Sequence, residues 1–258
     1  MKSSFSQSRT KARAAGALRA AIAFLTRLPA GKAAAFDAAD VAQSAGWFPL
    51  IGILLGAIYC GAAALLKPHL PLGVIAVVLV LLDALATGAL HYDGLADSAD
   101  GFGGGKTRED ILRIMHDHAI GSYGGLALAI AVTLKVVAYD ALLGKSIWIP
   151  ALILTPALGR WSILLLTATL PYARADASPV EGMGKRALVF GTLSIVVALG
   201  AAMSGRAWIA AAVVVAVTAG FGQYCQRRIG GITGDTLGAN VQISEGAALL
   251  TFLWIGTH

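Results

Sequence analysis

The pattern of apolar positions divides the chain into long hydrophobic runs separated by short polar segments. A membrane-crossing helix needs about 20 consecutive apolar residues, and shorter runs are tolerated inside a bundle. The candidate spans are Trp47–Leu66, Leu72–Leu90, Gly124–Leu143, Ile147–Leu170, Leu188–Met203, Trp208–Tyr224 and Gly246–Ile255, the last of which is short. The pattern therefore predicts an all-α fold, a polytopic transmembrane helical bundle of about six to seven spans with short cytoplasmic helices.

The polar segments organise a single integral-membrane domain that covers residues 1–258. Residues 1–46 form a basic arm, which we expect to lie in the cytoplasm and to contain an interfacial helix. Residues 91–123 form an acidic cytoplasmic loop that is expected to carry the active site, and residues 225–245 form a second polar cytoplasmic loop.

Composition agrees with a membrane protein and sets its orientation. Only 13% of the residues are charged, well below the roughly 25% of soluble domains. Most of the 20 Lys and Arg residues lie in the N-terminal arm and in alternate loops, which predicts a cytoplasmic N-terminus by the positive-inside rule. The net charge is +6, but the basic residues are not clustered in a stripe with interleaved aromatic residues. No nucleic-acid partner is therefore expected.

The most informative polar segment is His91-Tyr-Asp-Gly-Leu-Ala-Asp-Ser-Ala-Asp-Gly-Phe-Gly-Gly-Gly-Lys106, directly after an apolar run. Asp93, Asp97 and Asp100 stand at i, i+4 and i+7, so a helix here aligns their carboxylates on one face. Such close like charges repel unless a cation lies among them, and their oxygens suit Mg²⁺ or Mn²⁺. We predict that these three aspartates are catalytic and bind a metal; the alternative is a solvated acidic loop.

The remainder of this segment adds further candidates. Gly101 and Gly103–Gly105 let backbone N–H groups approach an anion, although glycines also commonly end helices. Thr107 and Asp110 resemble a capping box that begins a short helix, Arg108–His118. That helix carries Asp117, a candidate fourth carboxylate for the metal.

A second polar cluster precedes the last apolar run. Asp235 and Glu245 should face the same cytoplasmic surface as Asp93, so we expect both carboxylates to bind the metal, with Asn240 as a substrate contact. The alternative is an ordinary capped connection in which Ser244 begins the final helix.

Basic residues supply candidate phosphate contacts. Arg160 lies inside an apolar run, where a charge is costly unless it faces a cavity or a partner. It is either a clamp for a phosphate or a structural pair with a buried acid such as Asp83. Arg27 and Lys106 are two further candidate substrate-binding residues.

This combination of groups suits phosphoryl or nucleotidyl transfer, in which a metal neutralises charge on phosphate oxygens. Asp93-Gly-Leu-Ala96 resembles the start of the CDP-alcohol phosphotransferase motif, but Asp97 stands where that family has Arg. A similar membrane enzyme acting on another nucleotide-activated substrate is therefore one alternative. A divalent-cation transporter is another, although transporters place their ion sites near the bilayer midplane. An intramembrane aspartyl protease would need Asp83 to face Asp235.

Six fragments in order resemble the cobalamin synthase family over almost the whole chain. They are Phe24-Leu-Thr-Arg-Leu-Pro29, His91 to Gly105, Ile114-Met-His-Asp117, Gly159-Arg-Trp161, Leu170-Pro-Tyr-Ala-Arg174 and Gly234-Asp-Thr-Leu-Gly-Ala239. The sequence departs from the family around Asp117, which His116 and His118 flank in place of basic residues.

The resemblance implies a Mg²⁺-dependent, multi-pass enzyme of the bacterial inner membrane with a cytoplasmic active site. Its substrates would be the corrinoid adenosylcobinamide-GDP and α-ribazole or α-ribazole 5′-phosphate, and its products GMP and adenosylcobalamin or its 5′-phosphate. The lipid bilayer is an expected partner, and assembly into a homo-oligomer is left open.

Overall fold

The bundle consists of helices, in agreement with the predicted all-α class. The structure, a computed structural model, describes residues 15–29, 36–117, 119–174, 184–202 and 205–257. Within these ranges the only β pairing is one parallel bridge between Tyr172 and Ile232. After a first helix, Ala15–Leu25, the elements are α2 (Ala38–Ser44), η2 (Ala45–Trp47), α3 (Phe48–Leu66), α4 (Leu72–Thr87), α5 (Leu90–Gly104), α6 (Arg108–Ile114), α7 (Ser122–Leu143), α8 (Trp148–Thr169), α9 (Lys185–Ala201), α10 (Ala207–Ile229) and α11 (Gly234–Ile255).

Four continuous helical segments are long and apolar enough to cross a membrane: Ala38–Leu66, Ser122–Leu143, Trp148–Thr169 and Ala207–Ile229. The bent pair of α4 and α5 makes up to five. The expected six to seven spans also counted α9, which has only 17 residues, and the last part of α11. That count is higher than four or five but compatible with this bundle.

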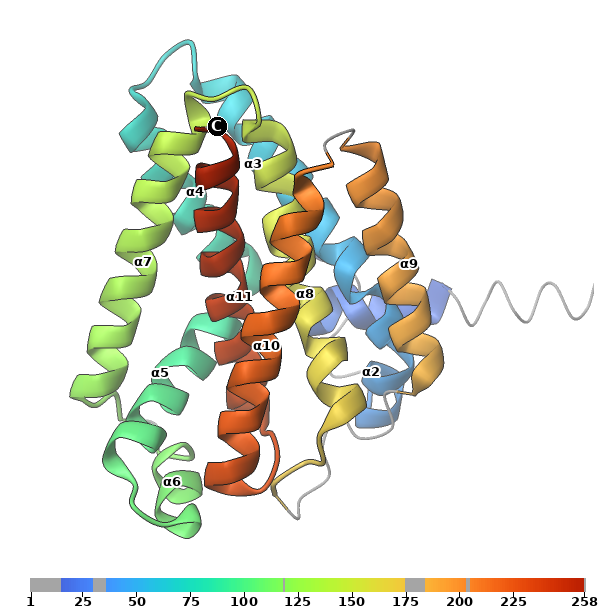
Figure 1. Cartoon of the computed structure of the whole chain (residues 1–258), viewed down its shortest axis with the longest axis vertical. Coiled ribbons are helices and arrows are strands. Elements are labelled where there is room, and N and C mark those ends of the chain that lie inside the picture. The colour runs from blue at the N-terminus through green and yellow to red at the C-terminus, as the bar shows by residue number, and fades with distance from the viewer. Residues whose placement is uncertain (1–14, 30–35, 118, 175–183, 203–204, 258) are drawn as a thin grey trace, which may run out of the picture.

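Helix α11 runs through the middle of the molecule, between α7 on one side and α8 and α10 on the other (Figure 1). A capping box at Thr233 and Thr236 begins it. Residues 234–245 are therefore helical, whereas we expected a polar loop over 225–245. The polar side chains of this half are buried against neighbouring helices, which shield them from lipid.

Helix α4 ends sooner than the apolar run that predicts it. The run extends to Leu90, but the helix stops at Thr87 and the chain turns by 90° into α5. Gly88 (φ 64°) and Ala89 (φ 57°) both adopt left-handed conformations there. The turn places α5 and α6 together at one end of the bundle (Figure 1).

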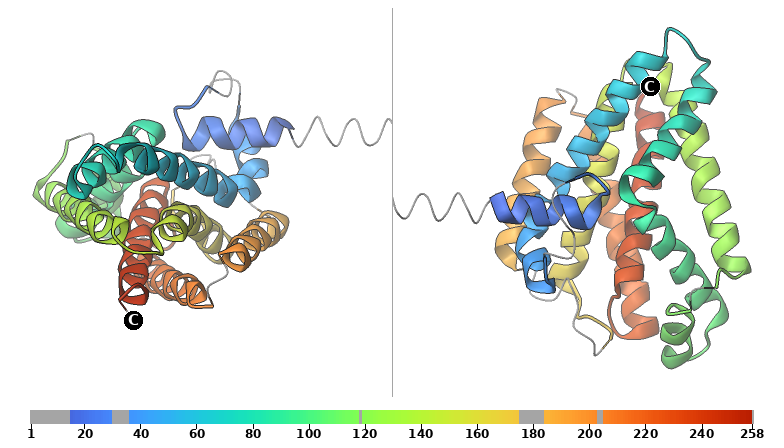
Figure 2. Two further views of the ribbon diagram at one scale, coloured as in Figure 1. Left: turned by 90° about the horizontal axis from the view of Figure 1, so that it is seen from above. Right: turned by 180° about the vertical axis from the view of Figure 1, so that it is seen from behind.

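The first helix, Ala15–Leu25, lies crosswise to the bundle and packs over α3 (Figure 2). Such a placement fits the interfacial helix expected in the basic arm. The basic residues of that arm from 1 to 14 lie outside the described residues.

Candidate active site

A cavity of about 710 Å³ lies between the first helix and the α4–α5 turn. The segment Phe24 to Pro29 forms one wall and Thr87 to Leu90, with Asp93, forms the other. Arg27 and Asp93 are the two charged side chains that line it. Two segments far apart in the sequence thus bring a predicted phosphate contact and a predicted catalytic carboxylate to one cavity.

Backbone contacts fix the position of Arg27. Its N–H donates to the Ala86 carbonyl at 2.7 Å, and the Thr26 hydroxyl donates to the Ile22 carbonyl at 2.7 Å. The guanidinium lies against Gly88, where an added Cβ would be 3.1 Å from the Arg27 Cζ atom. The glycine therefore makes room for Arg27 as well as permitting the left-handed turn.

The acidic face of α5 is helical, as predicted. Asp93 is exposed in the first turn and Asp97 is half-buried one turn later. A carboxylate in the first turn of a helix is favoured by the unpaired N–H groups there. These two aspartates remain candidates for the catalytic, metal-binding face.

Asp100, which the sequence predicts as a metal ligand, connects α5 to the start of α7. Its two carboxylate oxygens accept hydrogen bonds from the N–H groups of Gly121 (2.7 Å) and Gly124 (2.8 Å) at the start of α7. The first N–H groups of a helix have no partner within it, and a carboxylate satisfies them well. Asp100 therefore caps α7, and it is buried rather than open to the cavity.

Asp235 lies close to α5, as the predicted convergence requires. Gly94 and Gly238 allow α5 and α11 to approach so closely that a Cβ on Gly94 would be 2.7 Å from the Asp235 carbonyl oxygen. The Asp235 carboxylate pairs with Arg174 at 2.9 Å. Burial raises the pKa of Asp235. The pairing with Arg174 acts to lower this pKa and the nearby negative charge of Asp93 acts to raise it, so that the pKa lies above its ordinary value.

Arg174 is a residue that the sequence reasoning did not assign to the site. The parallel bridge holds its segment in place, because the Ala173 N–H donates to the Ile232 carbonyl at 2.8 Å. The available signal was its position in the fragment Leu170-Pro-Tyr-Ala-Arg174, directly after a helix end.

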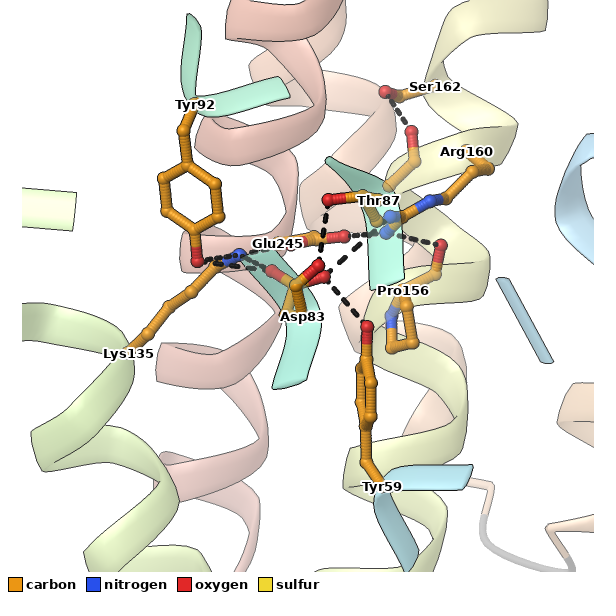
Figure 3. Close-up of polar contacts among 10 residues, drawn as sticks. Tyr59, Asp83, Thr87, Tyr92, Lys135, Pro156, Arg160, Ser162 and Glu245 are labelled. Carbon is orange, nitrogen blue, oxygen red and sulfur yellow. Dashed lines mark hydrogen bonds and ion pairs between the residues drawn. The ribbon is translucent and has the colours of Figure 1, made fainter. Parts of the chain in front are cut away.

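Glu245 and Arg160 lie in a buried ionic cluster, which we define as Asp83, Lys135, Arg160 and Glu245 (Figure 3). Arg160 pairs with Glu245 and lies 3.9 Å from Asp83. Lys135 Nζ lies 2.6 Å from Glu245 and 3.0 Å from Asp83. Glu245 thus pairs with two cations inside the bundle. Arg160 pairs with buried acids that include Asp83, as the structural alternative predicts.

The other three predicted site residues are dispersed. Asn240 is fully buried and donates to Ser162 (2.8 Å) and Thr218 (3.4 Å), which joins α11 to α8 and α10. Lys106 is exposed in the turn between α5 and α6, away from the residues that line the cavity. Asp117 is exposed beyond the end of α6, because that helix stops at Ile114.

The glycine run packs against side chains and does not form an anion cradle. Gly101–Gly104 belong to α5. A Cβ on Gly103 would lie 2.5 Å from the Tyr123 ring, and one on Gly105 would lie 2.6 Å from Ile111. These glycines let α5 and α6 fold closely onto each other and onto the start of α7.

The carboxylates fit a metal only if the substrate supplies further ligands. Within the described parts of the chain, no three His, Cys, Asp or Glu side chains are grouped to hold a metal ion. Mg²⁺ commonly takes only one or two carboxylates and completes its shell with water and substrate phosphates. Asp93 and Asp97, one turn apart, suit that arrangement.

The chain is similar to a family of known enzymes over nearly its whole length. A sequence model of the family described as Cobalamin-5-phosphate synthase matches residues 17–253. An adenosylcobinamide-GDP ribazoletransferase of Syntrophobacter fumaroxidans is 37% identical over 233 residues, covering 87% of this chain and 93% of the relative. The enzyme of that name from Ralstonia nicotianae is 39% identical over 245 residues (91% and 92%), and that from Azorhizobium caulinodans 40% over 249 residues (91% and 94%).

No solved structure matches the chain. The family model, over residues 17–253, nevertheless covers the residues that build the cavity, the α4–α5 turn and the ionic cluster. The chain therefore belongs to the cobalamin-5-phosphate synthase family.

Proposed function

We propose that this protein joins adenosylcobinamide-GDP to α-ribazole or α-ribazole 5′-phosphate. GMP is released, and adenosylcobalamin or its 5′-phosphate is formed. The family membership supports this reaction, and the apolar helices support a multi-pass protein. In the bacterial inner membrane, the basic N-terminal arm would place the cavity end in the cytoplasm.

The observation that carries the proposal is the cavity shared by Arg27 and Asp93. The donor is a diphosphate, and a guanidinium beside a cavity is suited to bind phosphate oxygens. In the reaction, an acceptor hydroxyl attacks the phosphorus attached to the corrinoid side, and the bond to the GMP oxygen breaks. Arg27 would bind the diphosphate and stabilise the charge that moves onto the leaving GMP.

We also propose Mg²⁺ as the cofactor, with Mn²⁺ as a substitute. Asp93 and Asp97 would hold the ion together with the donor phosphates, and the ion would supply neutralisation of phosphate charge. Removing divalent cations with EDTA should abolish GMP release, and added Mg²⁺ should restore it. Full activity in EDTA would show that the reaction does not need a divalent cation.

The Asp93→Asn variant tests the catalytic face directly. In membranes that contain the protein, we expect GMP release from adenosylcobinamide-GDP and α-ribazole to fall at least about 100-fold, because the amide loses the charge that binds Mg²⁺. Asp140→Asn is the matched control, since Asp140 is exposed on α7 and lies away from the cavity. Equal activity of the two variants would contradict the assignment.

The Arg27→Gln variant tests phosphate binding. We expect KM for adenosylcobinamide-GDP to rise about tenfold or more, because a charge-assisted bond to phosphate is lost. Arg206→Gln, at the exposed start of α10, is the control. If KM for the donor is unchanged in Arg27→Gln, the diphosphate does not bind to Arg27.

The transporter alternative gains no support from the bundle interior. Among the described residues, the buried acids Asp83 and Glu245 are paired with Lys135 and Arg160, and the buried Asp100 accepts from two N–H groups of α7. A cation site would need carboxylates open to an ion. Metal flux into proteoliposomes without any release of GMP would overturn the enzymatic proposal.

A further inference from the structure

The buried ionic cluster has matched charges and joins four helices. Asp83 comes from α4, Lys135 from α7, Arg160 from α8 and Glu245 from α11. All four residues are at most 3% exposed. Its two cations balance its two anions, so a buried cluster of this kind is tolerable only while every member keeps its partners.

Two tyrosine hydroxyls bind Asp83 from opposite sides (Figure 3). The Tyr59 hydroxyl, from α3, donates to Asp83 Oδ1 at 2.7 Å. The Tyr92 hydroxyl, from α5, donates to Asp83 Oδ2 at 3.1 Å and accepts from Lys135 Nζ at 3.2 Å. The two tyrosines therefore contribute the same chemical group to the same carboxylate, but from different helices.

Tyr92 immediately precedes Asp93 on α5. Successive residues of an α-helix point about 100° apart around its axis. When the Tyr92 ring is held inward by Asp83 and Lys135, the adjacent Asp93 side chain is directed away from the cluster, where it lines the cavity.

The α4–α5 turn makes this anchor necessary. The two left-handed residues, Gly88 and Ala89, interrupt the helical backbone, so α4 alone does not determine how α5 is rotated about its own axis. The far end of α5 is held by Asp100 at the start of α7. At the near end, beside Asp93, the hydrogen bond from the Tyr92 hydroxyl to Asp83 holds α5 in place.

We infer that Tyr92 is a positioning residue, which acts through Asp83 and Lys135 to hold Asp93 at the cavity. The role of Asp93 in this inference rests on the proposed function. Tyr92 does not itself line the cavity, so its effect should fall on the rate of the reaction and not on substrate binding.

The pair Tyr92→Phe and Tyr59→Phe tests the inference with matched chemistry. Each variant keeps the ring and removes one hydroxyl bonded to Asp83, so the losses of thermal stability should be similar. We expect Tyr92→Phe to lower kcat for GMP release about tenfold or more while KM changes less than about twofold, because the arrangement of the reacting groups is disturbed. Tyr59→Phe, corrected for folded protein, should keep kcat within about twofold of the original.

Equal kcat values for the two variants, whether both reduced or both unchanged, would overturn the inference. So would a loss in Tyr92→Phe that appears only as a raised KM. Either result would reduce Tyr92 to one contact among several in the ionic cluster.

A second measurement does not depend on the reaction. Asp93→Cys is prepared in a chain carrying Cys60→Ala and Cys225→Ala, which removes both native thiols. The rate of labelling by a charged methanethiosulfonate reagent should change about threefold or more when Tyr92→Phe is added, and should stay constant with Tyr59→Phe, because Tyr92 lies next to position 93 on α5 and Tyr59 lies on α3.

The two measurements separate the two proposals. A chain that never releases GMP overturns the proposed function, while the labelling rates still decide on Tyr92. Equal labelling rates in all three backgrounds overturn the positioning role even where the activity of Tyr92→Phe falls.

Discussion

At the α4–α5 turn, Ala89 has a strained backbone conformation close to the cavity. Ala89 is the non-glycine residue with positive φ among the described residues, and the left-handed region costs an L-residue about 1–2 kcal/mol. Strain of this kind is often retained at functional sites. Here it allows α5 to leave α4 at 90° and to carry Asp93 to the cavity.

The variants Ala89→Gly and Gly88→Ala should therefore shift stability in opposite directions. Ala89→Gly should stabilise the fold by about 0.5–1 kcal/mol, after the entropy of the added glycine is counted. Gly88→Ala should destabilise it by at least about 1 kcal/mol and should also weaken donor binding, because its Cβ collides with the Arg27 side chain. Thermal unfolding in detergent checks both; equal midpoints for the two variants would contradict the role given to the turn.

The contacts of Asp100 and Glu245 could not be predicted from their positions in the sequence, whereas the pairing of Arg160 with Asp83 was one of the two alternatives. Asp100 satisfies N–H groups of a helix that begins more than twenty positions later. Glu245 finds its cations on α7 and α8. Such pairings depend on which helices become neighbours, and that information is not contained in local spacing.

Helices were predictable where they are apolar throughout, and less so where they carry polar side chains inside the bundle. Long apolar runs identified α3, α7, α8 and α10 nearly to their ends. The sequence predicts a loop over the first half of α11 because this segment contains Asp235, Asn240, Gln242 and Glu245. These side chains are polar and yet lie within the bundle, where other helices supply their partners.

At the level of helix pairs, the close approach of α5 and α11 should depend on Gly94. A Cβ on Gly94 would lie 3.1 Å from the Gly238 Cα atom and closer still to the Asp235 carbonyl. Gly94→Ala should therefore cost about 1–3 kcal/mol through overpacking, and it should also lower GMP release by moving Asp93 away from Asp235.

The control for that variant is Gly220→Ala on α10, since nothing lies within 4 Å of a Cβ there. This substitution should raise stability slightly, by about 0.5–1 kcal/mol, because alanine favours the helix. Chemical denaturation in detergent measures both changes. If Gly94→Ala proves as stable as Gly220→Ala, the two helices do not require the glycine contact.

For the molecule as a whole, the balanced charges of the ionic cluster matter more than any one of its ion pairs. Lys135→Met leaves an uncompensated negative charge in the interior and should destabilise the protein by about 3–5 kcal/mol. Adding Glu245→Gln restores neutrality, with Arg160 and Asp83 still facing each other, and should recover at least about half of that loss. A double variant that is less stable than Lys135→Met would show that the separate contacts, and not neutrality, stabilise the bundle.

The length of α4 has a consequence for how the reactants reach the enzyme. A helix of 16 residues rises about 24 Å, which is less than the roughly 30 Å of a hydrocarbon layer. With the start of α4 at one membrane surface, the turn at its end and the cavity beside it would lie within the hydrocarbon layer. In the proposed reaction, water and the large polar reactants would follow the polar side of α5 to this recess, and neither reactant would have to dissolve in lipid.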